Sequence, residues 1–162
     1  MSLGDIQVLR EGAFGLGPVE KFAVAAGAVA SINAGEPVSK ALSAAVVASL
    51  ATNKPEVASD FLAGIAMTTS TDTVAAAGTV DVLKLVPGVV YMCAGNDLTA
   101  IDTQAEYDAL VGNRVLFDKT AGVYTVLVAD NANNGLVIEP LDIAKYPGMI
   151  AFSLRQALSY SA

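Results

Sequence analysis

The sequence predicts a mainly-β protein, either a small β-barrel or a sandwich, with one short α-helix and an extended N-terminal arm. Short apolar runs alternate with turn signals made of Gly, Pro and Asn, and this alternation recurs about every 10 to 15 residues. Only one segment carries both helix start and helix stop signals. The chain of 162 residues is long enough for one ordinary domain. We expect an arm over residues 1–20, a single domain over residues 21–162 and a helix near 104–111.

The arm is predicted from its glycines and its scattered apolar side chains. A short strand is expected at residues 6–9, after which Gly12, Gly15, Gly17 and Pro18 interrupt regular structure. A segment this apolar needs a surface to lie against, and an extended segment can add a strand to the sheet of a neighbouring molecule. The predicted interface residues are Ile6, Val8, Leu9, Phe14, Leu16 and Val19.

Short strands and turns are expected between the arm and residue 94. Pro37 cannot donate to a strand ladder, so the strand that it begins belongs at an edge or starts there. Residues 44–51 fit a helix or a buried strand, since Ala favours helix and Val favours strand. Residues 55–61 fit a helical turn. The remaining expected elements are strands at 22–25, 61–68, 79–86 and 89–94, a turn at 33–35, a polar loop at 69–77 and a hairpin around Pro87-Gly88.

The one helix is predicted from its ends. Thr103 and Glu106 have the spacing of a capping box, and Gly112 stands where a left-handed residue ends a helix. The C-terminal part reads as β-structure with punctuating turns. Its expected elements are strands at 114–117, 123–128, 136–139 and 149–155, a hairpin loop at 118–122, turns at 130–135 and 147–148, and a crossover at 140–146.

The composition is apolar and poor in charge. Hydrophobic residues make up 54% and charged residues 15%, with a mean hydropathy of +0.54. The longest apolar stretches, 22–30 and 41–51, are shorter than the roughly 20 residues that a membrane helix needs. No secretory signal is recognisable at the N-terminus, so we expect synthesis in the cytoplasm and no membrane partner. The apolar surplus therefore indicates contacts between protein molecules.

Charge and missing residue types lower the prior for several functions. The net charge of −7 disfavours a nucleic-acid partner. The absence of histidine removes the usual base of Ser and Cys triads and the commonest transition-metal ligand. Cys93 is the single cysteine, which excludes an intrachain disulfide, and its apolar surroundings predict a buried side chain. We expect a protein that is not an enzyme.

Two groups of polar residues imitate chemical sites. The cluster of Asp130 with Asn131, Asn133 and Asn134 carries one charge and lacks the closing Glu of a calcium loop, so a turn is favoured. The acids Asp97, Asp102, Glu106 and Asp108 are better explained by helix capping and a solvated face than by acid–base chemistry. We therefore expect no catalytic residue, no cofactor and no metal.

Four short motifs, in their order along the chain, resemble the capsid decoration (cement, or head-stabilising) proteins of tailed phages. The chain has an extra Ala63 inside the second motif. The resemblance covers about residues 33–94 and implies a small β-barrel or tulip-like core without catalytic residues. The motifs are Asn33-Ala34-Gly35-Glu36-Pro37-Val38, Asp60-Phe61-Leu62-Ala63-Gly64-Ile65-Ala66, Gly78-Thr79-Val80-Asp81-Val82 and Pro87-Gly88-Val89-Val90-Tyr91.

The resemblance also implies partners and a location. Many proteins of this family form trimers that sit at local three-fold positions of the shell, so the expected partners are two further copies and the major capsid protein. The expected location is the capsid surface of a virion, where the protein bridges capsomers and stabilises the head. Two alternatives stay open: another virion subunit, such as a head-fibre base, a tail or an adhesin-like protein, and a β-domain that binds a small ligand or a carbohydrate.

Overall fold

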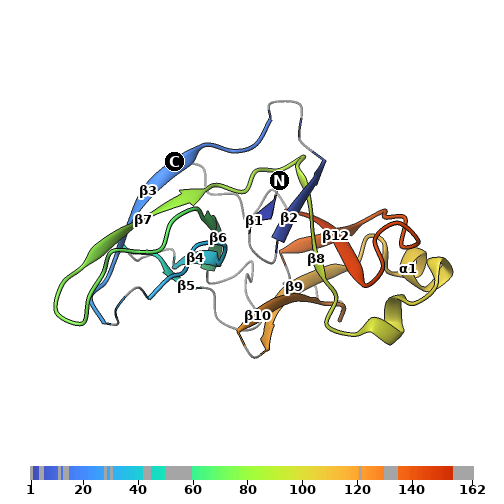
Figure 1. The fold of residues 1–162 in the computed structure, drawn as a ribbon. Helices are drawn as coiled ribbons and strands as arrows, with labels where there is room; N and C mark the ends of the chain where they lie inside the picture. Colours follow the sequence, from blue (N-terminus) through green and yellow to red (C-terminus); the bar gives the residue numbers. More distant parts are fainter. Residues whose placement is uncertain are drawn as a thin grey trace.

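The computed structural model is mainly β, with two antiparallel sheets and one short α-helix in a sandwich-like arrangement (Figure 1). It describes residues 2–3, 6–10, 12, 15–27, 29, 31–41, 45–49, 60–120, 122–129 and 135–154. Within these residues neither sheet closes into a barrel, so the sandwich alternative is the one confirmed.

The larger sheet has seven strands in the order β1-β2-β8-β12-β11-β9-β10. Its inner positions alternate with more exposed ones, as the pattern of β11 shows, because successive side chains of a strand point to opposite faces. The strands are β1 (Ser2–Leu3), β2 (Ile6–Arg10), β8 (Val90–Ala94), β9 (Arg114–Thr120), β10 (Val123–Leu127), β11 (Leu136–Glu139) and β12 (Met149–Leu154).

Aromatic rings fill the core of the larger sheet. Phe152 stacks on Tyr91 with ring centroids 5.9 Å apart. It also meets Phe117 edge-on at 5.4 Å, and Phe117 in turn meets Tyr124 edge-on at 6.4 Å. All four side chains are at most 1% exposed. Burial of the hydroxyl raises the pKa of Tyr91 to about 12.

The smaller sheet has five strands in the order β3-β7-β6-β4-β5. Its core consists of Val24, Ile32, Val38, Val47, Ala66, Val80 and Val82, with Phe22 half-buried against it. The strands are β3 (Val19–Val24), β4 (Pro37–Ala41), β5 (Ala48–Ser49), β6 (Asp60–Ala66) and β7 (Gly78–Leu83).

The extra Ala63 falls at a β-bulge between β4 and β6. Val38 pairs with Gly64, and the next residue, Ser39, pairs with Leu62. Ala63 is therefore left without an opposite residue, which is how a bulge absorbs one additional residue in a strand. The additional residue is thus accommodated locally, and the pairing continues on both sides.

The predicted hairpin around Pro87-Gly88 is wrong. The turn itself is present, since Gly88 has φ +88° and the Val89 amide donates to Val86 at 3.5 Å. However, β7 belongs to the smaller sheet and β8 to the larger one. The chain crosses between the sheets here because Leu85 and Val89 are buried in the core of the larger sheet. A turn signal specifies a local reversal, but it does not specify which strands pair.

The helix α1 (Gln104–Leu110) confirms the predicted capping. Thr103 and Glu106 form both hydrogen bonds of the capping box, and Gly112 adopts φ +90° just beyond the helix. A short 3-10 helix, η1 (Leu98–Ile101), precedes it and was not predicted. The hairpin loop expected at 118–122 is shorter than predicted, because β9 and β10 pair up to Thr120 and Val123.

Three expected segments lie partly outside the described residues. Of the predicted helical turn at 55–61, only Asp60 and Phe61 are described, and they are in β6. The predicted turn at 130–135 is described only at Gly135. In the ambiguous segment 44–51, the described residues include the strand β5 and Val47, which forms a bridge with Val24 of β3.

Candidate functional site

The structure places most of the predicted interface residues against the protein's own core. Ile6 is fully buried in the core of the larger sheet, and Val8, Leu9 and Leu16 are partly buried against that core. Val19 is 55% exposed at the start of β3. Phe14 lies outside the described residues. Strand β2 pairs with β8, so the first half of the arm lies on the protein's own sheet. The contact of the arm with a neighbouring subunit stays a prediction.

The most exposed large apolar side chains lie on two adjacent loops of the smaller sheet. Val29 is 72% exposed and Val74 is 70% exposed. The Gly27 amide donates to the carbonyl of Thr73 at 3.3 Å, which joins the two loops. We call this surface the loop tip. Its described residues, all exposed, are Ala25, Ala26, Gly27, Val29, Thr73, Val74, Ala75, Ala76 and Ala77.

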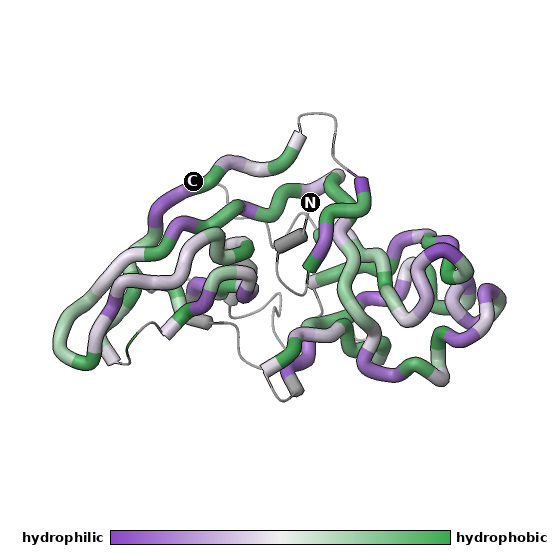
Figure 2. The backbone as a smooth tube through the Cα atoms, in the orientation of Figure 1, coloured by the Kyte–Doolittle hydropathy of each residue, from purple (hydrophilic) through white to green (hydrophobic). Residues whose placement is uncertain are grey.

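The loop tip carries no charge. The sequence has no charged residue between Lys21 and Glu36, and Asp72 is the one acid between Asp60 and Asp81. Asp72 itself is only 2% exposed, so it does not contribute a surface charge. Figure 2 shows the end of the smaller sheet in apolar and neutral colours. Although the chain has a net charge of −7, the loop tip has no charged side chain in contact with solvent.

The buried carboxylate of Asp72 joins the two loops at their base through hydrogen bonds, and we call this group of Asp72, Ser70, Ser31 and Ile32 the Asp72 clamp. Asp72 accepts hydrogen bonds from the Ser70 hydroxyl at 2.5 Å and from the Ser31 amide at 3.2 Å. The Ser70 hydroxyl oxygen accepts from the Ile32 amide at 3.0 Å. The hydrogen bond from Ser70 is the largest effect on the pKa of Asp72 and lowers it, against the smaller opposing effect of desolvation. Asp72 is therefore ionised at neutral pH and holds both loops.

The backbone around the loop tip is also closely packed. A Cβ atom on Gly78 would lie 2.1 Å from the Asp72 nitrogen, so the loop can approach β7 only because residue 78 is glycine. Within the second loop, Thr73 and Ala76 exchange hydrogen bonds, from the Thr73 amide at 2.9 Å and to its hydroxyl at 3.0 Å. These contacts order the loop around Val74 and hold it against β7.

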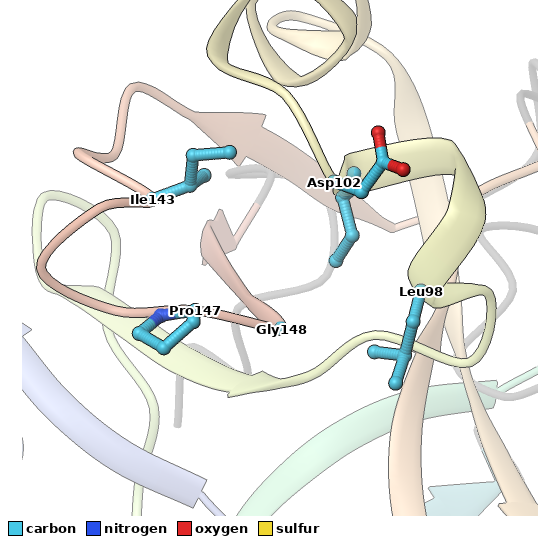
Figure 3. A pocket seen from close by; sticks show the side chains of 6 residues that line it. Leu98, Asp102, Ile143, Pro147 and Gly148 are labelled. Carbon is cyan, nitrogen blue, oxygen red and sulfur yellow. The ribbon is translucent and has the colours of Figure 1, made fainter.

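A hollow of about 380 Å³ lies beside η1 (Figure 3). Asp102 is the one titratable side chain among its described lining residues, and in the figure its carboxylate points away from Pro147 and Gly148. The other lining groups are aliphatic or backbone, so the hollow has an apolar character. The lining residues are Leu98, Ile101, Asp102, Ile143, Pro147 and Gly148.

The acids near this hollow serve the helix ends, as the sequence predicted for Glu106. Glu106 accepts from the Thr103 amide at 3.2 Å, and Asp97 accepts from the Thr99 amide at 3.0 Å. Asp102 shares a hydrogen bond with Glu106, which raises the pKa of Asp102 and lowers that of Glu106. Asp102 and Glu106 are both exposed to solvent.

The described residues show neither a cluster of metal ligands nor a membrane-spanning helix. Within the described ranges, no three Cys, Asp or Glu side chains gather in a group that could hold a metal ion. The Asp130 cluster lies outside those ranges. Of the helices described, none is long and apolar enough to cross a membrane. The prediction that Cys93 is buried is confirmed, and its thiol donates to the Tyr124 carbonyl at 3.1 Å.

Comparison with known proteins found no family model, no curated protein and no solved structure that matches this chain. The resemblance to phage decoration proteins therefore stays a prediction that rests on the motifs of residues 33–94. The loop tip was not among the predicted interface residues. The charge-free run between Lys21 and Glu36 is the sequence signal that points to it.

Proposed function

We propose that this protein is a capsid decoration protein of a tailed phage, which binds the outer surface of the head as a trimer and bridges capsomers. The observation that carries the proposal is the loop tip: Val29 and Val74 are exposed, free of neighbouring surface charge, and held by the Asp72 clamp. The order of motifs in residues 33–94 supports the family. The mainly-β class agrees with what that family implies, although the described strands form two open sheets and not a closed barrel.

An uncharged, rigid surface suits a protein partner. The buried centre of a protein interface is depleted of charged residues, and a surface that is already ordered loses little conformational entropy when it binds. A stable contact needs about 1,000 Å² or more of buried area. In a trimer, three loop tips and exposed arm residues such as Val19 would contribute to this area together.

Decoration stabilises a shell through mass action. Contacts that span two capsomers exist only in the assembled state, so each bound copy shifts the equilibrium toward the intact head. No chemistry at the protein surface is needed for this effect. The two-sheet body serves as the support that holds the loop tip at a fixed position.

The proposal is tested by rebinding to heads of the parent phage from which the protein has been stripped. Occupancy is measured for the unaltered protein, for Val74→Asp and for Val29→Asp. Val123→Asp is the matched control, because Val123 is 49% exposed at an edge of the larger sheet, away from the loop tip. We expect the tip variants to lose about tenfold or more in affinity, and the control to rebind normally.

Three results would reject the proposal. The unaltered protein fails to bind stripped heads, or electron microscopy places it on the tail, or both tip variants rebind as well as the control. Light scattering tests the trimer separately: a species of three times the 16.5 kDa chain mass is expected, and a chain that remains a monomer at every concentration contradicts it.

Deletion of the arm is not a usable test. Removal of residues 2–18 would take away β1 and β2 and would remove Ile6 from the core of the larger sheet. Loss of binding by that variant would therefore report unfolding. Val19→Asp is the better probe of the arm, because Val19 is exposed in the folded protein.

A further inference from the structure

A second hollow, of about 490 Å³, lies between the end of β2 and the crossover at residues 140–146. It is on the larger sheet and has no residue in common with the loop tip. Its floor is apolar and its rim is charged. The lining residues are Leu9, Arg10, Val90, Pro140, Leu141, Asp142, Lys145 and Tyr146. We call it the basic cleft.

A β-bulge aims two consecutive side chains into the basic cleft. Val8 pairs with Tyr91, and Arg10 pairs with Val90, so Leu9 and Arg10 together oppose a single residue of β8. Neighbouring residues of a regular strand point to opposite faces. Leu9 and Arg10 both line the cleft because the bulge breaks this alternation, and bulges are frequent where a strand must redirect a side chain at a functional site.

The opposite wall presents Lys145 in a fixed position. The carboxylate of Asp142 accepts from the Ala144 amide at 3.0 Å and from the Lys145 amide at 3.4 Å, which closes a turn. The Lys145 ammonium lies 5.0 Å from the centre of the Tyr146 ring. The turn and the cation–π contact together hold the ammonium at the rim.

Arg10 and Lys145 differ in their charge partners from three of the lysines. Lys21, Lys84 and Lys119 each form an ion pair with a carboxylate, at 3.9, 3.1 and 3.2 Å. Within the described part of the chain, neither Arg10 nor Lys145 forms such a pair. Two cations without carboxylate partners thus meet at one cleft of a protein whose net charge is −7.

We propose that the basic cleft binds an acidic polypeptide segment in which a carboxylate side chain lies beside an apolar one. The carboxylate would pair with Arg10 and Lys145, and the apolar side chain would cover Leu9 and Val90. Asp142 contributes one negative charge at the same rim, so the described lining residues carry a net charge of +1 and accommodate a single carboxylate better than a polyanion. Nucleic acid carries one charge at every phosphate, so the negative charge of the whole chain repels it more strongly than a segment with a single carboxylate.

The test uses the full-length protein and two blocked peptides. The probe is acetyl-Leu-Glu-Leu-amide, and the matched neutral peptide is acetyl-Leu-Gln-Leu-amide. Binding is followed at low salt through the backbone amide resonances of residues 8–10 and 144–146. We expect the Glu peptide to shift these resonances and to bind about tenfold more tightly than the Gln peptide, as the pairing of one carboxylate with two cations implies.

Variants assign the effect to the cleft. Arg10→Gln and Lys145→Gln should each weaken binding of the Glu peptide by about fivefold or more, whereas Lys21→Gln on the smaller sheet should leave it unchanged. Arg10 and Lys145 are exposed, so these variants keep the fold, which circular dichroism checks. Equal binding of both peptides overturns the proposal, and so does undiminished binding by both cleft variants. Binding of inorganic phosphate as tight as that of the Glu peptide also overturns it, because the cleft would then be a simple anion site.

Discussion

The two sheets bury their inner faces in different ways. The larger sheet encloses aromatic rings from β8, β9, β10 and β12, and these rings contact one another. Among the described residues, the buried core of the smaller sheet is aliphatic, with Phe22 half-buried against it, and the strands approach so closely that glycine is required at Gly64. Two charged residues are also buried on the smaller-sheet side. Asp72 lies in the loop between β6 and β7, and Lys84, which is 7% exposed, follows the end of β7.

This difference indicates a division of roles. Large buried rings contribute most to stability, since each removes much apolar surface from water. The core of the smaller sheet removes less apolar surface from water, and its stability depends more on close backbone packing and on hydrogen bonds. The larger sheet is therefore the stable body of the protein, and the smaller sheet supports the exposed loop tip. Contacts between the two remain extensive, because Ile65, Leu83 and Leu85 from the smaller-sheet side lie in the larger core.

The largest effect is expected in the core of the larger sheet. Phe152→Ala removes a fully buried ring that contacts both Tyr91 and Phe117, and it leaves a cavity. We expect a loss of about 3–5 kcal/mol in the free energy of unfolding, measured by urea denaturation. Leu98→Ala is the control, because Leu98 is 60% exposed and should change the free energy little. A loss at Phe152 no larger than at Leu98 would contradict the role given to the rings.

A smaller but still large effect is expected from Gly64→Ala in the smaller sheet. Gly64 has φ +154°, and a Cβ atom there would lie 2.1 Å from the Leu83 carbonyl oxygen. We expect a loss of about 2–4 kcal/mol by urea denaturation, since both the backbone and β7 would have to shift. Gly122→Ala separates the two causes: Gly122 also has positive φ, but its Cβ would meet nothing within 4 Å. Equal losses at both positions would show that conformation alone, without close approach, explains Gly64.

The smallest effect concerns the Asp72 clamp and depends on pH. The folded pKa of Asp72 lies below the ordinary value of 3.8, so its contribution to stability is present above that value and is lost as the pH falls through the folded pKa. Asp72→Asn should lower stability at neutral pH, and the difference from the unaltered protein should shrink in acid. Amide hydrogen exchange at Ser31 and Ile32 should also become faster in the variant.

Asp108→Asn, on the exposed face of α1, is the control for this clamp. It should leave the exchange at Ser31 and Ile32 unchanged, because Asp108 bonds to Gln104 on the same helix. A stability difference between Asp72→Asn and the unaltered protein that stays constant from neutral to acid pH would show that ionised Asp72 does not hold the loops.

Local signals in the sequence correctly predicted elements that depend on neighbouring residues. The sequence did not predict correctly which strands pair. The helix at 104–110 was predicted to within one residue, because Thr103, Glu106 and Gly112 act within a few positions of one another. The strands β10, β11 and β12 were also predicted closely from their apolar runs. The hairpin at Pro87-Gly88 was wrong, since β7 pairs with β3 and β6, whereas β8 pairs with β2 and β12 in the other sheet.

The candidate sites show the same limit. The arm was predicted to need a surface to lie against, and in the structure Ile6 packs in the protein's own core. The loop tip could have been suspected from the charge-free run after Lys21. Its second loop, around Val74, is brought beside it only by the folded smaller sheet. The basic cleft depends on Arg10 and Lys145, which lie far apart in the sequence, and no spacing rule connects them.

The sequence by itself determined the mainly-β class, the single capped helix, the burial of Cys93 and the low surface charge, because these follow from composition and from neighbours along the chain. Tertiary structure alone decided that the strands divide into two sheets, that Ala63 becomes a bulge and that Asp72 joins two loops. The physical reason is that strand pairing and close packing are set by which surfaces can be buried together, and that depends on the whole chain at once.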